Sequence, residues 1–266
     1  DTYKFNPQLF SKETIMHVKS NLVAEKVVNT TWKDQLRKGN VLNIPVFTTV
    51  VATEVTAGTE PTPRNAGTTA EAITIDKWYE STVQIDDMSD LENVADYMAG
   101  AAQAAAYAIA AKVDLDVGAL YSGLSGSSVY GSDGQTMTDD IIIAIREGLR
   151  EANVPDPERW NLVGDPSTEA DMYGIDKFVS SDYGANSVAV SGNIGRIYGM
   201  KVWVSNNLTA TTTGNYGCIL HPDAIGLVIQ QNPRVRTVPQ PWKFVTKIIV
   251  DCIWGEDEIR DTFGRA

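Results

Sequence analysis

The chain has 266 residues and a formal net charge of −12 at pH 7. That length allows one large domain or two modest ones with a substantial core, and a composition of 43% apolar and 21% charged residues excludes a disordered or fibrous protein. The acidic balance favours solubility and argues against a broad nucleic-acid-binding face.

The first 40 residues form a locally positive arm, since seven of them are Lys or Arg and four are Asp or Glu. Ser11 is placed to cap a short helix whose apolar residues recur every three or four positions. The Lys-Gly-Asn segment at 38–40 is a turn signal. We therefore predict an arm over residues 1–40 that ends where the first strand begins.

The next segment, residues 41–86, predicts a long antiparallel β-hairpin. β-branched and aromatic residues dominate its two ends, 41–55 and 73–85, and the polar part between them has an irregular tip near Pro61 and Pro63. Two strands alone are marginal in water, so another element has to bury them. The body of the same chain and a neighbouring subunit are both possible partners.

Residues 89–121 predict a long helix. Ser89 and Glu92 have the spacing of a capping box. No Pro interrupts the apolar residues that follow at steps of three and four: Leu91, Val94, Met98, Ala102, Ala105, Ile109, Val113, Val117 and Leu120. At ~1.5 Å per residue the helix is roughly 48 Å long, which suits a spine along which other elements lie.

An ordinary long core helix is the other interpretation of this segment. A membrane span is not expected, because its low-charge part between Asp96 and Lys112 is shorter than the ~20 residues that a bilayer needs.

A small α/β lobe is predicted over residues 123–225, and it begins with a Gly- and Ser-rich loop at 122–136. Thr138 is a predicted helix cap, residues 160–163 read as a short buried strand, and Asp165 with the following Pro predicts the start of another helix. Gly192, Gly195 and Gly199 then precede a strand, where we expect close backbone approach, and residues 205–207, Ser-Asn-Asn, predict a turn.

The last stretch, residues 226–266, is rich in strand-forming residues and has no helix of its own to pack on. The long helix is the available partner. The lobe is therefore expected to be an insertion between the long helix and the C-terminal strands, which form a sheet along that helix.

Catalytic, metal and cofactor sites are not expected. The sequence contains no P-loop and no GxSxG motif, and its glycines at 192, 195 and 199 do not match GxGxxG. Neither His17, in the basic arm, nor His221, before Pro222, has a plausible local acid or nucleophile for a catalytic triad, and Cys218 and Cys252 have no metal-ligand spacing. We therefore expect a protein that is not an enzyme and that carries no cofactor.

Taken in order, these elements resemble the Hong Kong 97-type major capsid proteins of tailed bacteriophages. The most specific likeness is GRIYGMKVWVSNNL at 195–208, which is similar to a G-x-I-x-G-x-x-V-x-x-S-N-x-L run in such coat proteins. The shared positions are Gly195, Gly199, Ser205 and Asn206. The segments FSKE at 10–13, GNVLNIP at 39–45 and LHPDA at 220–224 are also similar.

The resemblance implies an α+β fold with four parts. These are an N-terminal arm (1–40), a β-hairpin extension loop (41–86), a peripheral domain containing the spine helix (87–122 and 226–266) and an inserted axial domain (123–225). It implies that the extension loop lies across a neighbouring subunit. The residues at the loop tip that would make assembly contacts are Gly58, Glu60, Pro61, Pro63 and Arg64.

The implied function is that of a structural protein of the virion. Copies would assemble in the host cytoplasm, as hexamers and pentamers, into an icosahedral shell around double-stranded DNA that touches the acidic shell only weakly and non-specifically. The implied partners are further copies of the chain, a portal, a decoration protein, and a scaffolding protein that is separate or already removed.

The sequence departs from the family in one respect. The namesake phage cross-links its subunits through a Lys in the extension loop, whereas this chain has no Lys between Lys38 and Lys77, so we expect a non-covalent shell. An encapsulin, a cellular shell protein of the same fold, is the main alternative. A soluble α/β enzyme or binding module is a remote one.

Overall fold

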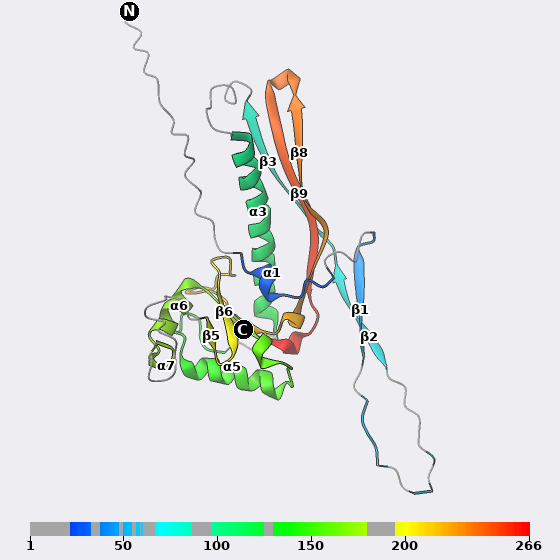
Figure 1. The fold of residues 1–266 in the computed structure, drawn as a ribbon, viewed down its shortest axis with the longest axis vertical. Coiled ribbons are helices and arrows are strands. Elements are labelled where there is room, and N and C mark those ends of the chain that lie inside the picture. The colour runs from blue at the N-terminus through cyan, green and yellow to red at the C-terminus, as the bar shows by residue number, and fades with distance from the viewer. Residues whose placement is uncertain are drawn as a thin grey trace, which may run out of the picture.

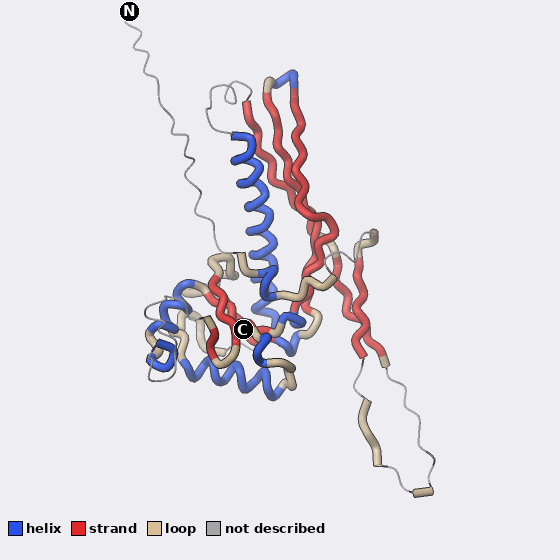
Figure 2. Tube along the Cα trace, in the orientation of Figure 1, coloured by secondary structure: helices blue, strands red, loops and turns tan. Residues whose placement is uncertain are grey.

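The computed structural model describes residues 22–32, 38–47, 50–54, 57–58, 60, 67–86, 97–124, 130–179 and 195–266. The predicted helix after Ser11, the capping box at Ser89 and Glu92, and Gly192 lie outside these residues. Within them, a long helix and its sheet form an upright layer, a compact lobe lies at its lower end, and a two-stranded ribbon projects from the side (Figures 1 and 2). No helix in the described ranges is long and apolar enough to cross a bilayer.

The predicted spine helix is confirmed over its described part. Helix α3 (Tyr97–Leu120) has 24 residues and is therefore about 36 Å long. Ala105, Ile109 and Val117, all on the predicted apolar face, are buried. An antiparallel sheet in the order β3 (Lys77–Asp86), β9 (Val245–Glu258), β8 (Ile225–Gln240) lies along the helix, as expected for the C-terminal strands (Figure 1).

The prediction of one hairpin over residues 41–86 is wrong in its second half. Strand β1 (Val41–Phe47) pairs with β2 (Thr68–Thr74), whereas β3 pairs along its whole length with β9. Tyr79 stacks on Trp254 of β9, and Ile85 is buried. The burial of Ile85 and the stacking of Tyr79 on Trp254 favour β9 as the partner of β3. Alternation along a strand does not by itself identify the strand with which it pairs.

The ribbon formed by β1 and β2 is anchored at its root. Ile73 and Ile75 pack with Val228 and Ile259 in a small second core. The close approach depends on Gly255 of β9, because a Cβ at this position would collide with the backbone of Thr74 and Ile75. The root of the ribbon therefore lies on the face of the sheet that points away from α3.

The predicted α/β lobe is confirmed in its architecture. In the described part of the chain it contains a five-stranded sheet in the order β10-β7-β4-β6-β5, in which β4 and β6 are parallel. Its elements are α5 (Asp139–Glu151), β4 (Asn161–Gly164), α6 (Pro166–Tyr173), α7 (Asp176–Val179), β5 (Arg196–Ile197), β6 (Met200–Val204), β7 (Cys218–Leu220) and β10 (Gly264–Arg265).

Short elements connect the layers. Helix α1 (Ala24–Val27) belongs to the arm, and single 3-10 turns lie at η1 (Tyr121–Gly123), η2 (Pro157–Arg159), η4 (Pro222–Ala224), η5 (Pro241–Lys243) and η6 (Asp261–Phe263).

The chain end departs from the prediction, because residues 226–266 do not all lie along the spine. After β9 the turn η6 redirects the chain, and β10 pairs with β7 in the lobe. Phe263 is buried in the process. The C-terminal strand thus fastens the lobe to the spine layer.

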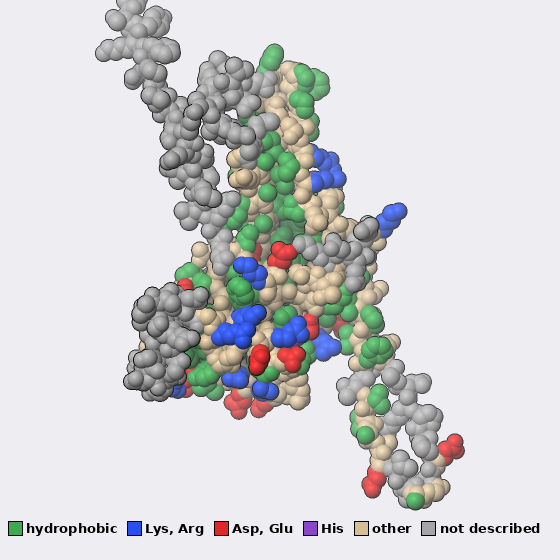
Figure 3. All heavy atoms as spheres, viewed as in Figure 1, with side chains coloured by type: hydrophobic (Ala, Val, Ile, Leu, Met, Phe, Trp, Pro, Cys, Tyr) green, Lys and Arg blue, Asp and Glu red, His purple; other side chains and the backbone are tan. Residues whose placement is uncertain are grey.

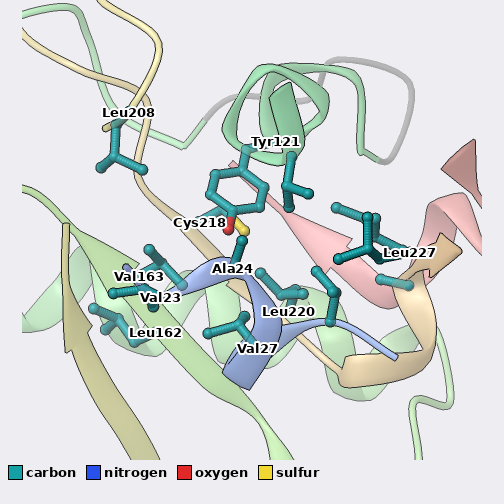
Figure 4. Packing of buried hydrophobic residues seen from close by; sticks show 14 of the residues in the cluster. Val23, Ala24, Val27, Tyr121, Leu162, Val163, Leu208, Cys218, Leu220 and Leu227 are labelled. Carbon is teal, nitrogen blue, oxygen red and sulfur yellow. The ribbon is translucent and has the colours of Figure 1, made fainter. Parts of the chain in front are cut away.

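One hydrophobic core runs through the junction of arm, spine and lobe (Figure 4). Val23 and Val27 of the arm, Tyr121 after the spine helix, and Cys218 and Leu220 of the lobe belong to the same buried cluster. Burial raises the pKa of the Tyr121 hydroxyl and of the Cys218 thiol well above their ordinary values, so both groups are neutral members of this core.

Candidate assembly surfaces and the junction behind them

The ribbon exposes apolar side chains away from its root. Phe47 is 74% exposed, Val50 55% and Val51 66%. Gly58, with a φ of +90°, and Glu60 are also exposed, while the predicted tip residues Pro61, Pro63 and Arg64 lie outside the described residues. In the part of the chain that the structure describes, the body covers the root of the ribbon and leaves these side chains bare.

The glycines of the GRIYGMKVWVSNNL segment shape a tight hairpin. Tyr198 (φ +49°) and Gly199 (φ +87°) form the two-residue turn between β5 and β6, the left-handed pair that hairpins of this length prefer. Gly195 (φ +64°) accepts a hydrogen bond on its carbonyl from the Val202 N–H at 3.2 Å.

The expected close backbone packing is wrong for Gly199. A Cβ built on this residue meets no atom within 4 Å. Position 199 favours glycine because its backbone is left-handed. This conformation costs a residue with a side chain about 1–2 kcal/mol.

Gly199→Ala is accordingly expected to lower the free energy of unfolding by about 1 kcal/mol, and Gly199→Asn by less, since Asn tolerates a left-handed conformation. Gly100→Ala is the matched control, because Gly100 also has open space around its Cβ position but lies inside α3. That change should stabilise by about 0.5–1 kcal/mol. Urea unfolding of unassembled subunits measures both, and equal effects at the two sites would contradict the conformational explanation.

A buried carboxylate, Asp114 on α3, connects three parts of the molecule. Its Oδ1 accepts hydrogen bonds from the backbone N–H groups of Val23 (2.9 Å) and Ala24 (2.6 Å) in the arm. Its Oδ2 accepts from the Ser205 hydroxyl (3.1 Å) and the Asn207 amide (3.0 Å) of the lobe. Asp114 is only 6% exposed, so these donors replace the water that a carboxylate needs.

The predicted motif residues Ser205 and Asn206 therefore have different surroundings. Ser205 is buried on Asp114, whereas Asn206 is exposed. Gly118, one turn after Asp114, lets the Asn207 carbonyl approach the helix, because a Cβ there would lie 2.9 Å from that oxygen. The sequence reasoning missed Asp114 and Asn207. The available signal for Asp114 was an acidic residue within the apolar repeat of the spine helix, which indicates a buried polar contact.

A second polar cluster lies between α3 and the sheet. Lys77 of β3 forms ion pairs with Glu256 and, at 3.6 Å, with Asp116. Lys112 binds the other oxygen of Asp116 at 2.5 Å and lies 5.1 Å from the centre of the Tyr79 ring. The hydrogen bond to Asp116 raises the pKa of Lys112. Lys77, the first Lys after Lys38, is thus held inside its own subunit.

The lobe contains a cleft of about 700 Å³ between the loops at 130–137 and 209–217. Its carboxylates are engaged in holding the fold. Asp133 accepts from Thr211 and from the N–H groups of residues 212–213, and Asp171 accepts from the Met137 N–H at 2.8 Å. Hydrogen bonds, led by that from Thr211, lower the pKa of Asp133.

Asp165, the third carboxylate of the cleft, caps α6 as predicted. Its Oδ1 accepts from the Thr168 N–H at 2.8 Å. Burial acts to raise the pKa of Asp165, but hydrogen bonds from Thr168, Asn215 and Ser167 outweigh it, so the pKa is lowered.

A carboxyl with a lowered pKa in the fold stabilises the protein at neutral pH and loses that contribution as the pH falls through the folded-state pKa. We expect Asp165→Asn to cost about 1 kcal/mol at pH 7 and to reduce the drop in stability between pH 5 and pH 3. Asp140→Asn, at an exposed position in the first turn of α5, is the control. Urea unfolding at several pH values tests this prediction. It would be contradicted if the free energy of unfolding of Asp165→Asn fell with pH as steeply as that of the unmodified chain.

Catalytic chemistry has no evident site in the described ranges. No group of three or more His, Cys, Asp or Glu side chains there could hold a metal ion. His221 is buried, accepts a hydrogen bond on Nδ1 from the Asp223 N–H at 3.2 Å, and packs edge-on against Phe263. Burial lowers its pKa. The neutral ring is therefore part of the turn between lobe and sheet.

Comparisons with known proteins identify a family and a fold that this chain resembles. The family model described as phage capsid protein matches residues 68–255. A structure from Mycobacterium phage Che8 superposes with a TM-score of 0.81 at 23% identity, covering 100% of this chain and 97% of the other. The capsid of cyanophage P-SCSP1u gives 0.76 at 17% identity, covering 98% and 92%. The mature capsid of bacteriophage PhiM1 gives 0.72 at 15%, covering 98% and 90%. A search of curated proteins finds no significant match.

Proposed function

Since this chain belongs to the phage capsid protein family and has the Hong Kong 97-type fold of phage capsids, we propose that it assembles as hexamers and pentamers into an icosahedral shell around double-stranded DNA. Its role is structural, and it resides in the capsid of the virion. The proposal adds the capsomer symmetry, the enclosed DNA with only weak non-specific contact, and assembly in the host cytoplasm.

The ribbon is the observation that carries the proposal. Its exposed Phe47, Val50 and Val51 form apolar surface that a soluble monomer would leave in water. A two-stranded ribbon of this kind is stable only when another surface covers it. A neighbouring copy in a shell supplies such a surface, and the residues at the tip, including Gly58 and Glu60, would then make contacts between subunits.

The division of the chain is part of the proposal. We assign an arm (1–40), an extension loop (41–86), a peripheral domain (87–122 and 226–266) and an axial domain (123–225). Two strands refine these limits, because β3 pairs within the sheet of the peripheral domain and β10 pairs within that of the axial domain.

The shell is proposed to be non-covalent. Lys77 is engaged by Glu256 and Asp116 of its own subunit, and the extension loop before it contains no other Lys. Denaturing gels of assembled particles should show a single subunit band, whereas a ladder of cross-linked subunits would contradict this. A separate scaffolding protein, a portal and a decoration protein are the further proposed partners. No enzymatic activity and no cofactor are proposed.

An encapsulin-like role is not favoured, because the family match is to phage capsid proteins. A soluble enzyme or binding module is not favoured for the same reason.

Sedimentation of the purified protein, with negative-stain imaging of the heavy fraction, tests the proposal. Closed hollow particles, or rings of five or six subunits, are the expected result. A monomer that stays stable at every protein concentration, salt concentration and pH would overturn it. The contents of particles recovered from cells distinguish a phage shell, which copurifies with packaging proteins, from an encapsulin, which copurifies with an enzyme.

A further inference from the structure

Two turns of the chain connect the lobe to the spine layer and are bonded to each other. One turn, residues 221–224, leads from β7 into β8, and the other, residues 260–263, leads from β9 into β10. The His221 N–H donates to the Phe263 carbonyl at 2.9 Å, and the Ile259 N–H donates to the Ala224 carbonyl at 2.8 Å. We call residues 221–224 and 260–263 the double turn.

The side chain of His221 lies inside the double turn. It is 1% exposed. Lys, Arg, Asp and Glu side chains are visible over the lobe in Figure 3, but no described His side chain reaches that surface. Its Nδ1 accepts a hydrogen bond from the Asp223 N–H at 3.2 Å, so the proton of the neutral ring is on Nε2. This Nε2 is buried and has no hydrogen-bond partner among the described residues.

Four charged side chains act on the His221 ring. Arg159 and Arg260 disfavour a positive charge on it, while Asp223 and Asp156 favour one. Burial is the largest influence, because the interior stabilises the neutral ring relative to the charged one. The pKa of His221 is therefore lowered from its ordinary value of 6.5, and the ring is neutral at pH 7.

Protonation changes the hydrogen bonds that the ring can make. An imidazolium has two N–H donors and no acceptor, so it no longer accepts from the Asp223 N–H. Its Nδ1–H instead faces the Asp223 carboxylate, whose Oδ2 lies 3.5 Å from Nδ1. The Nε2–H shares the positive charge and has no acceptor in the described part of the chain. Protonation thus removes the cap of the first turn and leaves a charged donor unpaired in the interior.

The Asp223 carboxylate also holds the arm. Its Oδ1 accepts a hydrogen bond from the Asn29 side-chain amide at 2.6 Å. The Asn29 backbone N–H donates to the Ile225 carbonyl, and the Asn29 carbonyl accepts from the Leu227 N–H, both at 3.1 Å. A charged ring competes with Asn29 for the carboxylate, because hydrogen bonds between charged groups are stronger than those from a neutral amide. The protonation of one ring is therefore linked to arm, lobe and spine layer.

We propose that His221 is a pH-sensitive latch, in which the neutral ring holds the double turn and the arm together and the protonated ring releases them. This device goes beyond the proposed shell function, since it belongs to each single subunit. A base whose pKa is lowered in the fold contributes its full stability above the unfolded-state pKa, near 6.5, and loses it as the pH falls below that value. The latch is therefore closed at pH 7 and loosens as the pH falls towards 5.

Amide hydrogen exchange of unassembled subunits at pH 7 and pH 5 tests the release. Protection is expressed relative to the intrinsic exchange rate at each pH, which removes the chemical effect of pH on exchange. For peptides that cover the double turn and residues 22–32, we expect protection to fall about fivefold or more between pH 7 and pH 5. Protection of α5, elsewhere in the lobe, should change by less than about twofold.

His221→Asn is the variant that isolates the ring. Asn offers an acceptor close to the position of Nδ1 but does not titrate, so protection of its double turn should agree at the two pH values within about twofold. His17→Asn, which replaces the only other His of the chain, is the matched control and should keep the full response. Burial raises the pKa of Glu258, which changes stability in the opposite direction as the pH falls. Glu258 is present in all three proteins, so its effect cancels in the comparison.

An NMR titration of the His rings keeps the test independent of whether the variants fold. In the unmodified chain, His221 should titrate at a lower pH in the folded state than in the chain unfolded by urea. Equal or higher values in the folded state, protection that is unchanged between pH 7 and pH 5, or an equal loss of protection in His221→Asn would overturn the latch. None of these measurements requires assembly. Failure of the latch therefore leaves the shell function standing, and a chain that never forms rings or shells leaves the latch intact.

Discussion

Replacing residues 48–67 with an Asn-Gly turn is expected to give subunits that fold normally and no longer close into shells. The change removes the exposed ribbon beyond the Phe47–Thr68 pair, and Asn-Gly suits the two-residue hairpin that remains. The root, with Ile73 and Ile75 in the second core, is untouched. The free energy of unfolding should therefore stay within about 1 kcal/mol of the unmodified chain.

Assembly should respond much more strongly. Each subunit loses the side chains that we place on its neighbour, and a contact worth about 1.4 kcal/mol changes an equilibrium tenfold. Because a shell repeats the contact at every subunit, the yield of closed particles is expected to fall by well over about tenfold.

A gentler variant, Val50→Ser with Val51→Ser, keeps the length of the ribbon and should give an intermediate yield. Sedimentation and negative-stain images measure all three proteins. Shells formed normally by the shortened chain would show that the ribbon has no intersubunit role.

Asp114→Ala is expected to be the most destabilising single substitution among those considered. It leaves the N–H groups of Val23 and Ala24, the Ser205 hydroxyl and the Asn207 amide without their acceptor in a buried site. Unsatisfied buried donors cost about 1–3 kcal/mol each, with partial recovery through water, so a total loss of about 4 kcal/mol is expected. Urea unfolding of unassembled subunits measures it.

The pattern of rescue identifies the cause. Asp114→Asn keeps the shape but offers an N–H₂ group where two donors converge, so it should recover less than half of the loss. Glu147→Ala, at an exposed position of α5, is the control and should change stability by less than about 0.5 kcal/mol. A loss below about 1 kcal/mol for Asp114→Ala would mean that water satisfies these donors as well as the carboxylate does.

Local signals determined several elements correctly from the sequence. The apolar repeat without Pro predicted α3, and the Asp165-Pro166 pair predicted the capped start of α6. These features depend on hydrogen bonds and side-chain faces within a few residues of each other, which the order of residues specifies directly. The resemblance to capsid proteins also predicted the α+β fold class, which the comparisons confirm.

The candidate assembly residues could be predicted only in part. The β-rich, punctuated sequence around Gly58 and Glu60 indicated a projecting ribbon, and the assembly role of these residues stays a prediction. Gly199 was recognised as special for the wrong reason. A left-handed backbone and a crowded Cβ both select glycine, and the sequence does not distinguish them.

Tertiary structure alone decided which distant segments meet. It assigned β3 to β9, returned β10 to the lobe, and brought Val23, Ser205 and Asn207 onto Asp114. The physical reason is that strand pairing and buried polar contacts depend on the total burial that competing arrangements achieve across the whole chain. The sequence by itself determined the spine helix and the capped start of α6, because local patterns specify them, while the fold decided which strands pair and which side chains meet at Asp114.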